Sequence, residues 1–391
     1  MAVPMQEELR GRTTASLVLE AAVMTMITML AFIGNTMVCW AVYNNKRLRT
    51  LPNMYVVTLA ISDILMGSFC MPLSLEVLIK AVWTKPFAVC QLQGFLSWFF
   101  AFTSLQTMTA MAINRYYRVV KPNRYGNYFT TRRVYISIVA IVIIASLGPG
   151  IAMMSRWSVN QIHYGKVLCF MVFISQGIEK GYIGFVDAFY ITTPIMIISV
   201  CYLKIFLTVR SHTKNLKSRN APMALPTGTS GSTLPSNEGR ANLTVNIEEV
   251  KVTKTLFATV VGFVTCWTPI AVIDMLDAYS SHQVHVPREV YFAWILLGYG
   301  SSSINPIIYG ILNRSFRREF IKIFSFKWRL SRSVVPEIEV VATTTMNLQR
   351  KLPRQSEPEM HVSGISSSAI ADYQVADLTK NRGSTTNTTT P

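Results

Sequence analysis

Polar side chains inside long apolar segments are the residues of this sequence that could bind an ion or a ligand. Asp63 stands in the middle of such a segment, which contains no basic residue, and a carboxylate in a membrane-like environment is costly. Polar residues at comparable depth in other segments could surround it with oxygen atoms: Asn35, Ser104, Ser302 and Asn305. We expect Asp63 to hold a sodium ion or a proton. The alternative is a structural carboxylate that its neighbours satisfy.

Acidic residues near the ends of apolar segments form a second candidate site. Asp274 follows Trp267 by seven residues, which places both on one helix face, two turns apart. We therefore expect a ligand with a positive charge or several hydrogen-bond donors, bound by Asp187 and Asp274. Three residues complete the predicted ligand site: Ser97, Tyr190 and Tyr299. In the alternative interpretation, these carboxylates face lipid headgroups or pair with Lys180 and Arg288.

The composition indicates which class of protein must position these residues. Half of the residues are hydrophobic and 15% are charged, whereas about a quarter are charged in a typical soluble protein. The net charge of +17 would suit a nucleic-acid binder, but the mean hydropathy of +0.33 favours a membrane protein. None of the six cysteines forms a Cys-x-x-Cys pair, and no nucleophile, base or metal constellation supports an enzyme.

Seven apolar segments are long enough to span a bilayer, which needs roughly 20 residues. They run over residues 17–43, 52–79, 87–119, 134–154, 181–209, 252–278 and 290–312. The chain thus divides into a polar N-terminus (1–16), a bundle (17–312), an amphipathic stretch (313–325) and a polar tail (326–391). We expect the tail and the loop at 210–250 to be disordered, because both are polar and rich in Ser, Thr, Gly or Pro.

The basic residues predict the orientation of the chain in the membrane. Only eight of the 37 Lys and Arg residues fall in the N-terminus and in the loops and segment ends on the same side. The positive-inside rule then places the N-terminus outside the cell and the C-terminus in the cytoplasm. This topology accounts for most of the net charge without any nucleic acid. Among the cysteines, Cys90 and Cys169 lie at the outer side and the other four lie within segments, so a disulfide is favoured over two free thiols.

Several motifs identify a family. The third, sixth and seventh segments contain Asn114-Arg115-Tyr116, Cys266-Trp267-Thr268-Pro269 and Asn305-Pro306-Ile307-Ile308-Tyr309. With Gly34-Asn35, Asp63, Pro194 and Tyr202, they resemble the rhodopsin-like (class A) G-protein-coupled receptors over residues 17–325. The resemblance implies an all-α membrane protein in the plasma membrane: a seven-transmembrane helix bundle with an amphipathic eighth helix. It argues against a transporter or channel, for which we find no repeated halves.

The resemblance also implies an activation switch. Arg115 would pair with Glu248 or Glu249 at the foot of the sixth segment, and family spacing favours Glu249. Trp267 lies beside the Pro269 kink and would act as a hinge; core packing alone is the alternative. Release of the pair would let the sixth helix move outward. The residues of this predicted switch are Arg115, Tyr116, Tyr202, Glu249, Trp267, Pro269 and Tyr309.

The partners implied by the resemblance are an extracellular small-molecule ligand, a heterotrimeric G protein, receptor kinases and arrestin. The kinases would act on the Ser- and Thr-rich tail, for which simple low-complexity solubility is the alternative. Membrane lipids would contact the amphipathic stretch, in which Phe316 and Phe320 repeat at helical spacing beside Arg317 and Arg318.

Within the family, the sequence is most similar to the melatonin-receptor-like set, which implies an inhibitory, cyclic-AMP-lowering G protein. Tyr299 replaces the lysine that binds retinal in opsins, so we expect no retinal cofactor. Ser97 stands where amine receptors carry an aspartate, which argues against ordinary amine recognition; an amine or peptide receptor is the alternative. Gly150 and Phe173 replace the polar residues that orient melatonin in that set. We therefore expect melatonin itself not to bind with high affinity.

Overall fold

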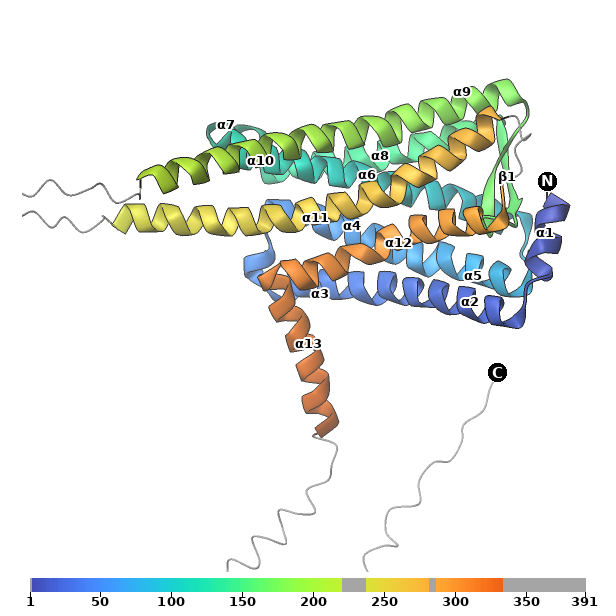
Figure 1. The fold of residues 1–391 in the computed structure, drawn as a ribbon, viewed down its shortest axis with the longest axis horizontal. Helices are drawn as coiled ribbons and strands as arrows, with labels where there is room; N and C mark the ends of the chain where they lie inside the picture. Colours follow the sequence, from blue (N-terminus) through green and yellow to red (C-terminus); the bar gives the residue numbers. More distant parts are fainter. Residues whose placement is uncertain (1, 220–236, 281–285, 333–391) are drawn as a thin grey trace, which may run out of the picture. The chain divides into compact units, whose positions relative to one another are not determined.

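The computed structural model describes residues 2–219, 237–280 and 286–332, and its long helices lie side by side along one common direction, which α1 (Ala2–Arg10) and α13 (Arg314–Arg332) do not share (Figure 1). Within these residues, seven helical segments are long and apolar enough to cross a membrane: Thr14–Asn44, Leu51–Lys80, Phe87–Val120, Thr131–Met154, Gln176–Ser211, Val260–Tyr279 and Arg288–Leu312. All seven predicted spans are confirmed to within a few residues at most ends. The predicted start of the sixth, at 252, lies inside the helix that forms this span.

The first, second and fifth spans each contain a π-helical turn. The first span consists of α2 (Thr14–Met29), η1 (Leu30–Gly34) and α3 (Asn35–Asn44), and the second of α4 (Leu51–Leu65), η3 (Met66–Cys70) and α5 (Met71–Lys80). The fifth consists of α9 (Gln176–Val186), η4 (Asp187–Thr192) and α10 (Thr193–Arg219). Pro72 and Pro194 each lie two residues after the end of one of these turns. Because proline cannot donate a backbone hydrogen bond, it favours such local rearrangement.

Single helices form the other four spans: α6 (Phe87–Val120), α8 (Thr131–Met154), α11 (Asn237–Tyr279) and α12 (Arg288–Leu312). Pro149, Pro269 and Pro306 lie inside α8, α11 and α12. The close approach of α12 to η1 requires a glycine, because a Cβ atom on Gly34 would lie 2.5 Å from Cγ of Pro306.

The connecting elements are short: α1 (Ala2–Arg10), η2 (Lys46–Leu48), α7 (Pro122–Tyr128) and the hairpin β1 (Ser158–His163) with β2 (Leu168–Phe173). Helix α13 (Arg314–Arg332) follows α12 and overlaps the predicted stretch at 313–325. The strands pair antiparallel, with Ser158 opposite Phe173 and His163 opposite Leu168. The hairpin lies near the N-terminus at one end of the bundle, called here the hairpin end, and α7 lies toward the other (Figure 1).

Two parts of the chain differ from the sequence-based expectation. The N-terminal segment forms a helix, α1, whose Met5 and Leu9 are buried although its other residues are mostly polar. In the third loop, α10 continues to Arg219 and α11 begins at Asn237, so helices extend into the stretch at 210–250 that was expected to be disordered. Residues 220–236 and the tail from 333 lie outside the described residues.

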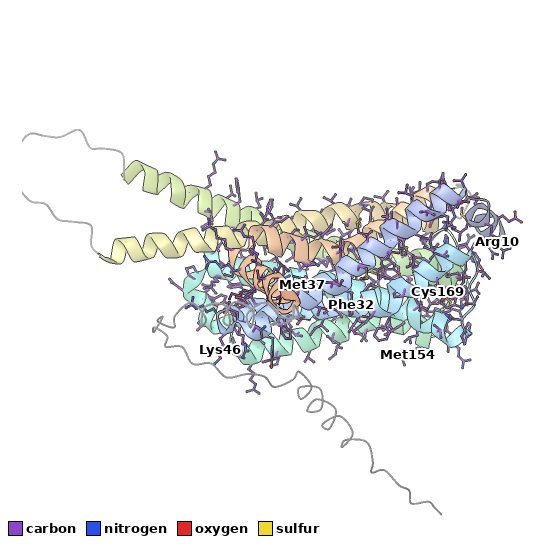
Figure 2. All side chains as sticks on the ribbon, turned by 90° about the horizontal axis from the view of Figure 1, so that it is seen from below. Arg10, Phe32, Met37, Lys46, Met154 and Cys169 are labelled. Carbon is purple, nitrogen blue, oxygen red and sulfur yellow. A yellow bond between two sulfur atoms is a disulfide. The ribbon has the colours of Figure 1, made fainter. Side chains whose placement is uncertain are left out.

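Apolar side chains cover the outer surface of the bundle as well as its interior. Phe32 and Met37 lie between charged Arg10 near one end and Lys46 at the other (Figure 2). Large exposed hydrophobic residues recur on the spans, among them Phe32, Ile136, Ile143, Leu203 and Phe206. A helix that is apolar on its outer face as well as its inner face is suited to lipid.

Candidate functional site

The hairpin is fixed to the bundle by a disulfide and an amide pair. Cys90 at the start of α6 is bonded to Cys169 in β2, as the sequence predicted. Next to this bond, Gln91 Nε2 donates to the carbonyl of Asn160 at 2.7 Å, and the Asn160 N–H donates to Gln91 Oε1 at 3.0 Å. The hairpin therefore has a fixed register over the end of α6.

Asp63 lies deep in the bundle and is 1% exposed. Asn305 Nδ2 donates to Asp63 Oδ2 at 2.9 Å, and Ser104 Oγ donates to Asp63 Oδ1 at 3.5 Å. Asn35 Nδ2 donates to the backbone carbonyl of Ser302 at 3.0 Å. The structure thus brings the predicted polar residues to neighbouring positions on four spans. Among the described side chains, no basic group forms an ion pair with Asp63.

A small cavity of about 50 Å³ lies between Asp63's neighbours and the hairpin. Its lining includes Ser104 and Ser302 at one end, Leu168 of β2 at the other, and the predicted residues Ser97, Trp267 and Tyr299. Tyr299 lies 2.8 Å from Ser74, oxygen to oxygen, so the position expected for a retinal lysine holds a hydrogen-bonded phenol. Trp267 packs on Phe263 with ring centres 5.3 Å apart. A volume of this size holds a water molecule or two rather than a ligand.

A larger cavity of about 550 Å³ lies at the hairpin end. Met5 of α1, residues of both strands, and Asp274, Asp277 and Tyr291 line it. Asp274 is buried, and its Oδ1 atom accepts a hydrogen bond from Lys166 Nζ at 2.8 Å. The predicted ligand carboxylate therefore does face a cavity, but it already has a basic partner. That partner is neither Lys180 nor Arg288, the two basic residues considered from the sequence.

The structure separates two other predicted ligand residues from this cavity. Asp187, in η4, lines an open groove against the outer face of α11, where exposed Met196 and Leu276 are its neighbours. Tyr190 donates to the carbonyl of Ile144 at 2.7 Å and so points toward α8. Both residues lie within the π-helical turn η4, Asp187–Thr192, whose presence in the fifth span hydropathy does not reveal.

Apart from Trp267 and Pro269, the described residues of the predicted switch lie toward the end of the bundle opposite the hairpin. Arg115, Tyr202 and Tyr309 are buried, and Tyr309 stacks on Phe316 of α13 with ring centres 5.5 Å apart. Tyr116 has two lysine side chains, Lys121 and Lys204, about 6 Å from its ring centre. Glu249 belongs to α11, but its side chain lies outside the described residues. The predicted contact between Arg115 and Glu249 therefore stays a prediction.

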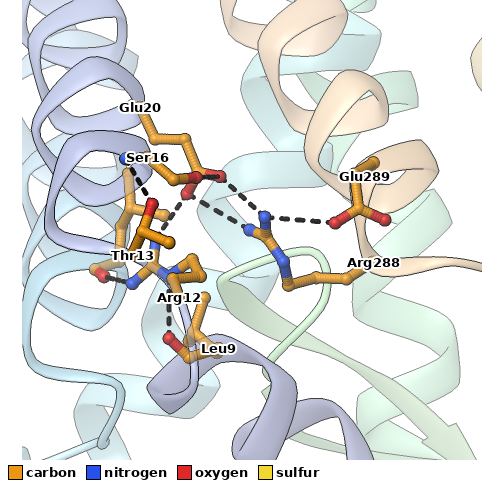
Figure 3. Close-up of polar contacts among 8 residues, drawn as sticks. Leu9, Arg12, Thr13, Ser16, Glu20, Arg288 and Glu289 are labelled. Carbon is orange, nitrogen blue, oxygen red and sulfur yellow. Dashed lines mark hydrogen bonds and ion pairs between the residues drawn. The ribbon is translucent and has the colours of Figure 1, made fainter.

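Sequence reasoning missed a buried ion cluster near the N-terminus. Glu20 of α2 is 8% exposed and accepts hydrogen bonds from Arg288 Nη2 at 2.7 Å and Nη1 at 3.2 Å, and from Arg12 (Figure 3). Arg12 also donates to the carbonyls of Leu9 at 2.7 Å and Leu78 at 2.5 Å. These bonds join α1, α2, α5 and α12. The signal was present: Glu20 is an acid within the first apolar segment.

The order and geometry of these elements match a known family. The family model "7 transmembrane receptor (rhodopsin family)" matches residues 34–309, which is more than half of the chain. The chain belongs to the rhodopsin family of seven-transmembrane receptors. Members of this family are G-protein-coupled receptors, so the protein is a multi-pass plasma-membrane receptor with a ligand and a G protein as partners, and the family is not an enzyme family.

Similar proteins refine this assignment. Melatonin receptor type 1A of Ovis aries is 27% identical over 307 residues, covering 78% of this chain and 76% of that receptor. Melatonin receptor type 1B-B of Danio rerio is 26% identical over 328 residues, covering 83% and 87%. The crystal structure of squid rhodopsin superposes with a TM-score of 0.68 at 23% identity, covering 90% and 97% of the two chains, which shows a shared fold.

Proposed function

We propose that this rhodopsin-family receptor binds a small extracellular ligand in the cavity at the hairpin end and activates an inhibitory, cyclic-AMP-lowering G protein. The observation that carries the proposal is the position of Asp274. Asp274 lines the cavity and lies two helical turns from Trp267 on the same helix. Pro269 lies between these two residues. A ligand that contacts Asp274 thus acts on the helix whose movement is expected to open the G-protein side.

The hairpin end is extracellular in this proposal. The uneven distribution of basic residues supports this orientation, since only eight of 37 fall on the hairpin side. The disulfide between Cys90 and Cys169 also supports it, because disulfides persist in oxidising surroundings. The C-terminal tail then faces the cytoplasm, where receptor kinases and arrestin would act on its Ser and Thr residues, and α13 would contact the inner lipid layer.

Activation is a shift of population between two packings of the bundle. An agonist favours the open packing only to the extent that it binds that packing more tightly. Arg115 and Glu249 would hold the closed form, while Tyr202 and Tyr309 would stabilise the open one. A sodium ion at Asp63 would favour the closed form, because the polar residues around Asp63 come from spans that must shift relative to one another.

The direct test measures GTP binding by purified inhibitory G protein in the presence of the full-length receptor in lipid nanodiscs. Glu249→Ala removes the proposed clamp and should raise ligand-free exchange several-fold over the wild-type receptor. A matched Glu289→Ala variant, which removes an exposed acid at the hairpin end, should leave exchange unchanged. If neither the wild type nor Glu249→Ala accelerates exchange on inhibitory, stimulatory or Gq-type proteins, the proposed function is wrong.

Melatonin is not the high-affinity ligand in this proposal, although the most similar relatives reported above are melatonin receptors. Gly150 and Phe173 offer no polar group at the two positions expected to orient melatonin, and the Phe173 ring instead packs on Tyr182 with ring centres 5.1 Å apart. Saturable binding of radiolabelled melatonin to receptor-containing membranes at nanomolar concentration would contradict this.

A further inference from the structure

We propose that Lys166 is a tethered occupant of the receptor's ligand site, and that the external ligand carries an organic ammonium group that replaces the Lys166 ammonium. The site is formed by five residues, called here the cation cage: Phe170, Asp274, Asp277, Tyr291 and Trp294. This inference rests on the proposed receptor function, because it names the chemistry of the ligand that the cavity would accept.

The Lys166 ammonium is enclosed by two carboxylates and by aromatic rings. Its Nζ atom lies 2.8 Å from Asp274 Oδ1 and 3.3 Å from Asp277 Oδ2. The same atom lies 3.8 Å from the ring centre of Phe170 and 4.8 Å from that of Trp294. Lys166 is only 1% exposed, and a desolvated cation within about 6 Å of aromatic faces gains attraction from the rings.

The composition of the cage selects an organic cation. Two carboxylates supply charge, and three aromatic rings supply apolar faces on which alkyl groups next to a charged nitrogen can pack. A metal ion would need several oxygen or nitrogen ligands at short range. Among the described residues, no group of three or more His, Cys, Asp or Glu side chains could hold a metal.

The conformation of the hairpin turn places the Lys166 side chain in the cage. Gly165 allows the turn to touch α12, because a Cβ atom there would lie 2.8 Å from Cδ2 of Tyr291. Val167 takes the left-handed backbone conformation, with φ of 46°, which is unfavourable for a β-branched residue. The Lys166 N–H donates to His163 Nδ1 at 3.1 Å. The turn is therefore fixed by its contacts with the bundle.

The Lys166 ammonium can be replaced because the cage opens onto a ligand-sized space. Lys166, Asp274, Asp277 and Tyr291 all line the cavity of about 550 Å³, within the usual range for small-molecule sites. A buried ion pair gains little net free energy over well-packed alternatives. An incoming ammonium group would keep both carboxylates paired, while Lys166 would return to water, where its charge is well solvated.

The cage also connects to the hinge. Trp294 contacts the Lys166 ammonium and lines the inner cavity together with Trp267. Asp274 and Asp277 belong to α11, whereas Tyr291 and Trp294 belong to α12. A cation in the cage thus bridges the hairpin, α11 and α12, and a ligand of different shape would change the separation of the two helices at this end.

The test uses the full-length receptor in nanodiscs and a small probe, n-propylammonium chloride, which replaces the three carbons and the ammonium that Lys166→Ala removes. Lys166→Ala should lower the apparent melting temperature, and millimolar n-propylammonium should restore at least half of the loss with saturation. n-Propanol and equimolar sodium chloride should not. The matched variant Lys85→Ala, at a partly exposed ion pair, should show no such response. Absence of saturable restoration, or an equal effect in Lys85→Ala, would overturn the proposal.

A second measurement needs no variant and so remains decisive if Lys166→Ala does not fold. Phenyltrimethylammonium, which lacks a reactive N–H, should displace Lys166 from the wild-type cage. Reductive methylation followed by mass spectrometry should then show at least a threefold rise in Lys166 modification, with exposed Lys80 as the internal control. Unchanged modification at saturating probe would refute displacement.

A third measurement compares affinities. Phenyltrimethylammonium should bind Lys166→Ala at least tenfold more tightly than wild type, because the tether no longer competes. Equal affinities would show that Lys166 does not occupy the ligand's site. None of these measurements involves a G protein. If these measurements succeed but the receptor does not accelerate GTP exchange, the cation cage is supported and the proposed function is wrong. If the receptor accelerates GTP exchange but these measurements fail, the proposed function is supported and the cation cage is wrong.

Discussion

Two buried aspartates of this receptor have different kinds of partner. Asp63 contacts Asn305 and Ser104, and no ion pair forms at it among the described side chains. Asp274 is also buried but pairs with Lys166 from the hairpin turn. The comparison teaches that one buried carboxylate here has only hydrogen-bond donors among the described side chains, whereas the other carries a cation supplied by its own chain. In the proposals above, a cation from solution would enter the site at Asp63 without a competitor, whereas at Asp274 it would have to displace Lys166.

The largest expected effect on stability comes from removing the charge of Asp274, which pairs with Lys166. Asp274→Asn leaves the buried Lys166 ammonium with Asp277 alone, and breaking a buried ion pair by removing one partner typically costs about 3–5 kcal/mol. The apparent melting temperature of the purified receptor should fall by many degrees. Asp63→Asn is the matched control, because it also removes a buried negative charge but strands no cation among the described side chains. Equal destabilisation by both variants would remove the distinction between the two sites.

The second effect tests whether the pair acts as a unit. Lys166→Met in the Asp274→Asn background removes the stranded cation and keeps an apolar chain of similar length. The double variant should be more stable than the sum of the two single effects predicts, with a coupling free energy of about 1 kcal/mol or more. Thermal denaturation of the four receptors provides the cycle. Additive effects would mean that Lys166 and Asp274 are in contact but are not energetically coupled.

The third effect tests the other aspartate. Sodium at about ten times its dissociation constant should stabilise the wild-type receptor by about 1.4 kcal/mol. In Asp63→Asn this stabilisation should disappear, whereas Asp274→Asn should keep it. The measurement compares melting curves in sodium chloride with those in N-methylglucamine chloride of equal ionic strength. Identical sodium responses in the wild type and Asp63→Asn would exclude an ion at this site.

The smallest effect concerns Asp187, which the sequence grouped with Asp274. Asp187 lies in a groove on the outer face of α11, away from the cage, so Asp187→Asn should change stability by no more than about 0.5 kcal/mol. Binding of phenyltrimethylammonium, followed by its effect on Lys166 modification, should stay within about twofold of wild type. A tenfold loss of phenyltrimethylammonium affinity would show that Asp187 does belong to the ligand site.

Much of the fold could be predicted because it depends on local composition. Seven apolar segments separated by polar loops define the bundle, and the positions of Cys90 and Cys169 relative to those segments indicate the disulfide. The surroundings of Asp63 were also predictable, since Asn35 and Asn305 stand at similar depths in their own segments. In each case the inference needed only the depth of a residue in the membrane, which the sequence itself supplies.

The cation cage could not be predicted in the same way. Lys166 reaches Asp274 because Gly165 lets the hairpin turn touch Tyr291 and because Val167 adopts a left-handed conformation. Neither feature follows from hydropathy, and the two partners are 108 residues apart. The α1 helix was missed for a related reason: burial of Leu9 depends on tertiary contact with the bundle rather than on the mostly polar sequence around it.

The cluster of Arg12, Glu20 and Arg288 has a consequence for the timing of the signal. It fastens the segment that follows α1, and Met5 of α1 forms part of the wall of the larger cavity. A ligand whose path crosses α1 would have to displace it, and a barrier on the path slows binding and release by the same factor. Affinity is then unchanged, while residence time lengthens. Receptor occupancy would accordingly follow slow changes in ligand concentration and average over brief pulses of ligand.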